Sequence, residues 1–327
     1  MHKYSVSLDM SNTCTMGCKF CYRRNINKTT KDNLSIDNIK ILIDILSKDP
    51  NFKKHIMFMG AEPTENMEGI KYFIDNCPDW SFSISSNGDY LKDPSSYEYL
   101  KKCRLFVSID PTEKLFRANR NAKDLIKFIT DIHNATPNAM FRSSFDKRFF
   151  DEYEEAKKTF EYIESLGAEW QINPTTGYLY DFSPDETFLK ALSILKHDMP
   201  AAYEDVLCAD GVGGELRHCR LDGSISIDMN LNLNPCVSIG AKYPSNINIK
   251  DVESISAIID YWGEHLLEPK LEKKLPICKG CPLEFKKCRM TCPLYQWDEN
   301  GDNEDLLNAC KLDLLIYYIK IGEIKLW

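Results

Sequence analysis

Short apolar segments alternate with amphipathic segments over roughly the first two hundred residues. Six segments read as strands, at residues 4–9, 55–59, 81–85, 104–109, 139–144 and 169–173. Helical patterns lie between them, including 36–47 with Ser35 as its N-cap and 151–166 closed by Gly167. Strands that alternate with helices favour a parallel sheet. The pattern therefore predicts an α/β fold, a partial (β/α)6 TIM-type barrel with its chemistry at the carboxyl ends of the strands.

The pattern changes after about residue 200. The alternation stops, three glycines follow one another closely (Gly211, Gly213 and Gly214), and cysteines become frequent. We therefore expect two domains, a barrel at residues 1–200 and a small cysteine-rich α+β domain at residues 201–327. The second domain is expected to depend on bound metal for its folding.

Charge and hydrophobicity narrow the range of partners. The chain has 327 residues and a net charge of -8, which argues against binding to phosphate backbones. No run reaches the roughly 18 apolar residues of a membrane span, and the N-terminus does not resemble a signal peptide. We therefore expect a cytoplasmic protein with neither a nucleic-acid nor a membrane partner. In that compartment its 13 cysteines are better suited to metal than to disulfides.

The segment CTMGCKFC, residues 14–21, places Cys14, Cys18 and Cys21 in a C-x3-C-x2-C pattern just after the first strand. Three thiols are an odd number for disulfides and one fewer than a closed tetrahedral zinc site needs. A 4Fe–4S cluster has four irons, so three cysteines would leave one iron open. A structural zinc loop is the alternative, but the position at the first strand of a βα pattern favours the cluster.

In this motif and its position, the sequence resembles the radical S-adenosylmethionine (SAM) superfamily. The resemblance implies that SAM chelates the open iron through its amino and carboxylate groups. It also implies that an electron from the cluster cleaves SAM to a 5′-deoxyadenosyl radical, which abstracts hydrogen from a substrate. The protein itself would supply placement and shielding.

Residues near the second strand extend the resemblance. The segment GAEP, Gly60 to Pro63, is similar to the family's GGEP motif, whose backbone and glutamate hold the methionine amino group. Ala61 replaces the second glycine, which is tolerable unless that position needs a positive φ. Phe20 matches the residue whose ring packs on the adenine. Without the resemblance, Glu62 would be a turn carboxylate and Phe20 a core residue.

Two later segments also match. Asn87, in an Asn-Gly turn after the third strand, is implied to lie near the ribose. Ser108 and Arg120 are implied to secure the methionine carboxylate, a task for which the arginine fork is suited. Pro111 stands where that pattern has glycine, so the local turn is expected to differ. The alternatives are a purely structural turn for Asn87 and an ordinary surface charge for Arg120.

A second set of cysteines resembles the SPASM domain of radical enzymes that modify peptides, which binds two auxiliary 4Fe–4S clusters. The resemblance implies an outer cluster on Cys278, Cys281, Cys288 and Cys310, and an inner cluster on Cys219, Cys236 and Cys292. Residues 225–236 resemble the strand–turn–strand that precedes the second cysteine of this domain. Leu231 departs from the pattern, because the family has glycine at the turn of this hairpin. A double zinc module is the alternative, since C-x2-C with C-x3-C is also zinc spacing.

Three further cysteines have separate interpretations. Cys208 is either the fourth ligand of the inner cluster or a free thiol that donates a hydrogen atom to a substrate radical; an ordinary buried cysteine is the remaining alternative. We lean towards ligation, because a thiolate on iron leaves no reactive thiol beside a radical. Cys77 and Cys103 are expected in the core.

The domain pair implies radical modification of a peptide or protein side chain, such as a thioether, a crosslink or an oxidation, as in the maturation of ribosomally made peptides. The first strand begins directly at residue 4, without a preceding winged helix to grip a leader. The two domains would then grip the substrate themselves, or a separate leader-recognition protein would recruit it. A dehydrogenase acting on a small molecule such as a sugar or aminocyclitol is therefore an alternative. A non-catalytic iron–sulfur electron carrier is another, but it would not explain Glu62, Ser108 and Arg120.

The implied cofactors are three 4Fe–4S clusters and SAM, and the implied partners include an external electron donor of the flavodoxin or ferredoxin type. No general base follows from the motifs. Asp110, Arg142 and the pair Tyr178 and Tyr180 are candidates to face the substrate.

Overall fold

The computed structural model describes residues 3–18, 21, 23, 32–114, 116, 124–145, 152–174, 186–200, 203, 223–237, 240 and 245–266, with 280, 282, 318, 319, 323 and 325. The chain divides into two compact units. The first comprises Met1–Arg142, Lys158–Trp170 and Arg220–Trp262, and the second comprises Ser143–Lys157, Gln171–Cys219 and Gly263–Trp327. The predicted domain boundaries, 1–200 and 201–327, stay a prediction.

The described strands are β1 (Tyr4–Asp9), β2 (Phe52–Met59), β3 (Ser81–Ser86), β4 (Arg104–Ile109), β5 (Met140–Phe145), β6 (Trp170–Pro174), β7 (Ser224–Ile227) and β8 (Leu233–Asn234). The helices are α1 (Ile36–Lys48), α2 (Met67–Asn76), α3 (Tyr97–Leu100), α5 (Leu125–Ala135), α7 (Tyr153–Ser165), α8 (Glu186–Asp198) and α11 (Ile255–Leu266). Short 3-10 helices include η1 (Pro63–Asn66) and η2 (Asp89–Lys92). All six predicted strands are confirmed, and β1 and β4 have the predicted bounds.

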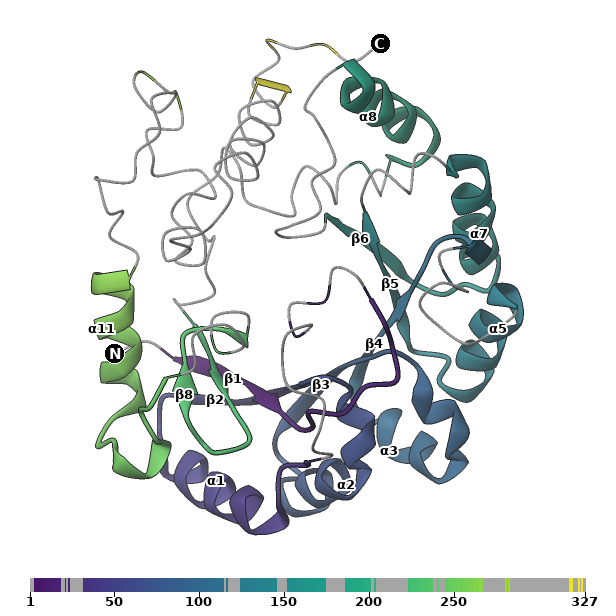
Figure 1. Cartoon of the computed structure of the whole chain (residues 1–327). Helices are drawn as coiled ribbons and strands as arrows, with labels where there is room; N and C mark the ends of the chain where they lie inside the picture. Colours follow the sequence, from purple (N-terminus) through teal and green to yellow (C-terminus); the bar gives the residue numbers. More distant parts are fainter. Residues whose placement is uncertain are drawn as a thin grey trace. The chain divides into compact units, whose positions relative to one another are not determined.

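The strands form one eight-stranded sheet in the order β6-β5-β4-β3-β2-β1-β7-β8 (Figure 1). β1 pairs in parallel with β2 and with β7, and the pairs β2–β3 and β3–β4 are parallel as well. β8 runs antiparallel to β7. The mostly parallel α/β fold is therefore confirmed. β7 extends the sheet beside β1, so the hairpin it begins belongs to the first unit.

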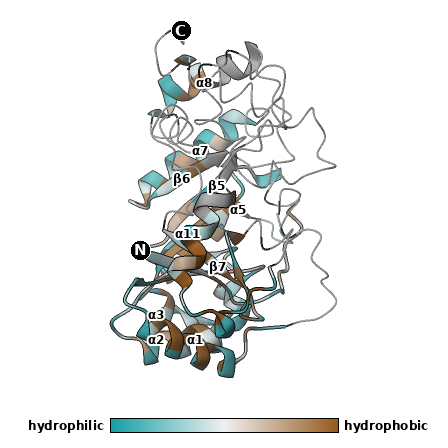
Figure 2. Ribbon diagram, turned by 90° about the vertical axis from the view of Figure 1, so that its left-hand side faces the viewer, coloured by the Kyte–Doolittle hydropathy of each residue, from teal (hydrophilic) through white to brown (hydrophobic). Residues whose placement is uncertain are grey.

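The helices pack on the sheet through apolar stripes. α1 begins at its predicted N-cap, where the Ser35 hydroxyl accepts a hydrogen bond of 3.2 Å from the Asn38 N–H. It buries Ile39, Leu42 and Leu46, a spacing that puts all three on one face. Figure 2 shows this mixed character, since α1 and α2 each carry both hydrophobic and hydrophilic colours. Among the described helices, none combines the length and hydrophobicity of a membrane span.

Gly167 ends α7 as the sequence predicts. Its φ of 68° is left-handed, a conformation that glycine adopts without steric cost. The Gly167 N–H donates to the Glu164 carbonyl at 2.8 Å, and the Ala168 N–H donates to the Ile163 carbonyl at 3.3 Å. These two bonds make a Schellman motif, which satisfies the last carbonyls of the helix.

The turn between β7 and β8 contains Leu231, which has a φ of 67° although it is not glycine. Asp228 shapes this turn, because its Oδ1 accepts hydrogen bonds from the Asn230 and Asn232 N–H groups at 2.8 and 2.9 Å. The Leu231 side chain is fully buried. Core packing therefore offsets a backbone conformation that costs a non-glycine residue about 1–2 kcal/mol.

The two contributions at Leu231 can be separated by a pair of variants. Leu231→Ala removes the buried side chain and keeps the strain, so it should lower the free energy of unfolding by about 2–5 kcal/mol. Leu231→Gly removes the side chain but also the strain, so it should be less destabilising than Leu231→Ala by about 1 kcal/mol. Urea denaturation of both variants measures the difference. A glycine variant less stable than the alanine variant would contradict a strained Leu231.

Candidate active site

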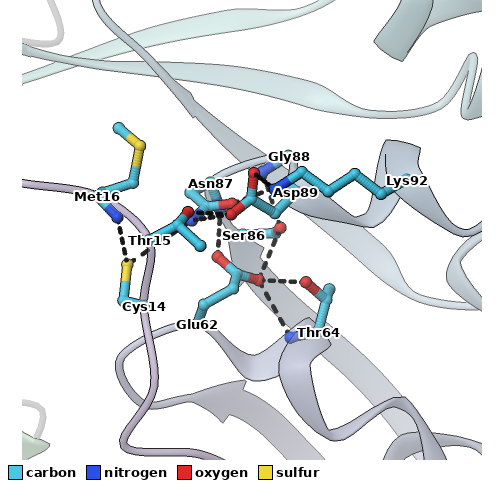
Figure 3. A network of polar contacts seen from close by, with 10 residues as sticks. All are labelled: Cys14, Thr15, Met16, Glu62, Thr64, Ser86, Asn87, Gly88, Asp89 and Lys92. Atoms are coloured by element: carbon cyan, nitrogen blue, oxygen red, sulfur yellow. Dashed lines mark hydrogen bonds and ion pairs between the residues drawn. The ribbon is translucent and has the colours of Figure 1, made fainter. Parts of the chain in front are cut away.

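The carboxyl ends of β1, β2 and β3 bring three sequence-predicted residues together (Figure 3). Neighbouring parallel strands end at the same edge of a sheet, so the segments that follow them meet there. Cys14 follows β1, Glu62 follows β2 and Asn87 follows β3. The Asn87 N–H donates to Glu62 Oε2 at 2.7 Å, and the Asn87 side-chain amide lies 3.7 Å from Cys14 Sγ.

The segment after β2 passes close to the segment after β1. Gly60 has a φ of 124°, and a Cβ at this position would lie 2.6 Å from the Ser11 carbonyl oxygen. The next residue, Ala61, donates its N–H to the same oxygen at 2.9 Å. Among the described residues, the non-glycines with positive φ are Lys54 and Leu231, so Ala61 needs no glycine. The close approach of the two segments explains the glycine at position 60 and the tolerance of alanine at 61.

Glu62 is almost fully buried and holds four hydrogen bonds. Its Oε1 accepts from the Thr64 N–H at 3.1 Å, the Thr64 hydroxyl at 2.6 Å and the Ser86 hydroxyl at 2.9 Å. Its Oε2 accepts from one donor among the described residues, the Asn87 N–H. Burial raises the pKa of Glu62, and the donors on Thr64, Asn87 and Ser86 oppose that shift. The carboxylate is thus fixed in direction, with acceptor capacity left on Oε2 for an amine.

Cys14, Cys18 and Cys21 have partly exposed side chains. The Met16 N–H lies 3.4 Å from Cys14 Sγ, and the Cys21 N–H donates to the Cys18 carbonyl at 3.3 Å. Burial raises the pKa of Cys14, and the hydrogen bonds from Met16 and Asn87 oppose this. Donors aimed at sulfur suit a thiolate ligand, so this set fits an iron–sulfur cluster.

An iron–sulfur cluster and a single metal ion differ in how close together their ligands stand. No three His, Cys, Asp or Glu side chains among the described residues gather closely enough to bind one metal ion. A 4Fe–4S cube binds each thiolate at a different iron, so its cysteines stand farther apart than the ligands of one zinc.

Several residues near this edge of the sheet were not singled out by the sequence. Thr64 and Ser86 orient Glu62, and their signal is weak, since small hydroxyl residues are common in turns. Asp9, the last residue of β1, forms a buried ion pair with Arg23, two residues after Cys21. Burial raises the pKa of Asp9, and the Arg23 guanidinium opposes this shift. The pair holds the Arg23 side chain at the end of β1.

The other predicted residues are distributed as follows. Ser108 lies on β4 with an exposed side chain, and Asp110 is buried just beyond that strand. The Arg142 guanidinium lies 3.5 Å from the centre of the Phe106 ring. Cys236 lies just after β8, and its side chain is partly exposed. Phe20, Arg120, Tyr178, Tyr180, Cys208, Cys219, Cys278, Cys281, Cys288, Cys292 and Cys310 lie outside the described residues.

Cys77 and Cys103 are buried in the core, as predicted. Burial is the largest cause of their raised pKa values, about 11 for Cys77 and about 12 for Cys103. Thiols with such pKa values stay protonated at neutral pH, so these two cysteines are not suited to hold iron.

Comparison with known proteins gives a family match over the first part of the chain. Residues 8–146 match the family model of the Radical SAM superfamily, and this span contains Cys14, Cys18, Cys21, Glu62 and Asn87. No curated protein is significantly similar to the sequence.

Two solved proteins share the fold over most of the chain. Streptococcus suis SuiB bound to precursor peptide SuiA is 16% identical, with a TM-score of 0.60 over 88% of this chain and 71% of SuiB. A structure of anSMEcpe with bound AdoMet and the Kp18Cys peptide is 14% identical, with a TM-score of 0.65 over 97% of each chain.

Residues 8–146 are a domain of the radical SAM superfamily. This part of the chain, which holds the three-cysteine motif, therefore has the signature of a superfamily whose members combine SAM with a 4Fe–4S cluster.

Proposed function

We propose that this enzyme uses SAM-derived radical chemistry to modify a side chain of a peptide or protein, as in peptide maturation. The observation that carries the proposal is the meeting of Cys14, Glu62 and Asn87 at one edge of the sheet. The choice of substrate is supported by the shared fold with SuiB and anSMEcpe, whose structures hold a precursor peptide and the Kp18Cys peptide respectively.

Each residue has a task in this proposal. Cys14, Cys18 and Cys21 would hold the cluster and leave one iron for SAM. When bound, the cluster supplies the electron that cleaves SAM to the 5′-deoxyadenosyl radical. Glu62 Oε2 would accept a hydrogen bond from the SAM amino group, helped by the backbone of Gly60, Ala61 and Pro63.

The remaining contacts to SAM follow the family's pattern. Asn87 would lie near the ribose and Phe20 on the adenine, and Ser108 and Arg120 would hold the carboxylate. An external donor of the flavodoxin or ferredoxin type would supply the electron. Binding of a leader by a separate protein is part of the same proposal.

We further propose two auxiliary clusters in the cysteine-rich part of the chain. Cys278, Cys281, Cys288 and Cys310 would hold one cluster, and Cys208, Cys219, Cys236 and Cys292 the other. The support is the cysteine spacing, together with the fold shared over 97% of the chain with anSMEcpe. An electron left on a substrate radical would then have an acceptor within the same chain.

The proposed substrate class is tested with peptides encoded beside the gene. The anaerobically reconstituted, reduced enzyme should change the mass of such a peptide only when SAM is present, and 5′-deoxyadenosine should form in proportion. The variant without Cys14, Cys18 and Cys21 is the control and should leave the peptide unchanged. Coupled oxidation of a sugar or aminocyclitol, with every peptide unchanged, would contradict the proposal and favour a small-molecule dehydrogenase.

A further inference from the structure

The turn after β3 is held by hydrogen bonds within itself and by close packing. We call Asn87, Gly88 and Asp89 the NGD turn. The Asp89 N–H donates to Asn87 Oδ1 at 2.7 Å, and the Gly88 N–H donates to the Ser86 hydroxyl at 3.0 Å. Gly88 has a φ of 88°, and a Cβ at this position would lie 2.5 Å from the Phe128 ring. The directions of the Asn87 and Asp89 side chains are therefore fixed by the turn itself.

The NGD turn contacts the cluster loop, residues 13–21, at two adjacent positions (Figure 3). The Asn87 amide lies 3.7 Å from Cys14 Sγ, and the Asp89 carboxylate accepts a hydrogen bond from the Thr15 hydroxyl. These partners are 73 and 74 positions apart in the sequence, so both contacts are tertiary. They connect the end of β3 to the first cysteine of the motif.

Asp89 is held in place from the other side as well. Its Oδ1 accepts from the Lys92 ammonium at 2.9 Å, and its Oδ2 lies 3.4 Å from the Asn87 amide. The Asp89 side chain is about four-fifths buried, whereas Lys92 is exposed. The carboxylate thus has a fixed position from which it can hold Thr15.

We propose that the NGD turn positions the SAM-binding cluster. Asp89 holds the cluster loop through Thr15, and Asn87 donates an N–H to the sulfur of Cys14. The resemblance to the radical SAM superfamily implies neither role. It places Asn87 near the ribose and assigns no role to Asp89. The inference rests on the assignment of the cluster to Cys14, Cys18 and Cys21 in the proposed function, but not on the substrate.

A chelator tests the Asp89–Thr15 contact in the reconstituted full chain without SAM. The chelator removes iron, and the rate of cluster loss is followed by electron paramagnetic resonance. The signal that is followed is the one that the variant without Cys14, Cys18 and Cys21 lacks. Asp89→Ala and Thr15→Val should each speed this loss by roughly threefold to tenfold, the effect of one hydrogen bond. The double variant should be no faster than the faster single variant, because both changes remove the same bond.

Two controls accompany this test. Asp89→Asn retains an acceptor oxygen for Thr15 and should behave more like the wild type. Asp93→Ala removes a nearby carboxylate that accepts a hydrogen bond from the Ser95 N–H. This variant should leave the rate of cluster loss unchanged. Thr15 is exposed, so its variant stays informative even if an Asp89 variant folds poorly. Unchanged rates in both single variants, or fully additive effects in the double variant, would overturn the role of Asp89.

Asn87 is tested by the midpoint potential of the same cluster without SAM. Asn87→Asp keeps the oxygen that accepts the Asp89 N–H but replaces the donor near Cys14 with a negative charge. Loss of an N–H···S bond and added charge both favour the oxidised cluster, so the potential should fall. An unchanged potential would overturn the role of Asn87.

The two levels of the proposal fail in different ways. If the triple cysteine variant keeps all the iron and all the signals, the cluster assignment itself is wrong. If that variant loses its signal while Asp89→Ala, Thr15→Val and Asn87→Asp match the wild type, the positioning role alone is wrong.

Discussion

Replacing Cys14, Cys18 and Cys21 together with alanine should abolish SAM cleavage and remove about a third of the bound iron. The expected fraction follows from three clusters of four irons, of which one depends on these thiolates. Cleavage should vanish completely, because it needs the one cluster that has an open iron. Iron analysis and chromatography of 5′-deoxyadenosine measure the two effects in the anaerobically reconstituted protein.

The matched control replaces Cys77 and Cys103, whose thiols are buried within the described part of the chain. That double alanine variant should keep its iron and its cleavage activity, because neither side chain is exposed to a cluster. Loss of nearly all iron in the triple variant would mean a single cluster, and zinc bound in the C-terminal part would point to a zinc module there. Unchanged SAM cleavage in the triple variant would contradict the assignment of the active site.

Glu62→Gln should weaken SAM binding by about tenfold to a hundredfold while the iron content stays unchanged. The affinity loss corresponds to a charge-assisted hydrogen bond of about 1.5–3 kcal/mol. The same variant should lower the free energy of unfolding by about 1–3 kcal/mol. Both carboxylate oxygens accept hydrogen bonds, so either orientation of the Gln amide turns an N–H towards a backbone donor, on Thr64 or on Asn87.

Glu65→Gln is the control for this prediction. It makes the same chemical change within η1, but the Glu65 side chain is exposed. SAM affinity, measured by equilibrium dialysis, should be unchanged in that variant. Wild-type affinity in a folded Glu62→Gln protein would show that GAEP does not bind the amino group.

The strands were predictable because their apolar residues alternate with polar ones. The start of β2 was not predicted correctly from this alternation, since the strand begins three residues before the predicted start. Tyr4 pairs with Phe52 and Val6 pairs with Ile56, so β2 contains extra residues that bulge out of the ladder. Lys54, with a φ of 52°, lies in this irregularity and interrupts the alternation that the prediction used.

In the candidate site, too, some residues were predictable from the sequence and others were not. Cys14, Glu62 and Asn87 were found because each stands in a short local motif. Thr15 and Asp89 were not, because their contact joins residues 74 positions apart and neither type is distinctive in a loop. The hairpin turn at Leu231 was also expected, from the resemblance to the SPASM domain. The pairing of this hairpin beside β1 was not, because a short strand does not reveal its partner.

The most direct test of the central assignment is an electron paramagnetic resonance titration of the reduced protein with SAM. One cluster signal should change shape as SAM is added, and the same signal should be missing from the variant without Cys14, Cys18 and Cys21. The signals of the auxiliary clusters should not change when SAM is added. A spectrum in which no signal responds to SAM, or in which the responding signal survives the triple replacement, would contradict a SAM-binding cluster at these three cysteines.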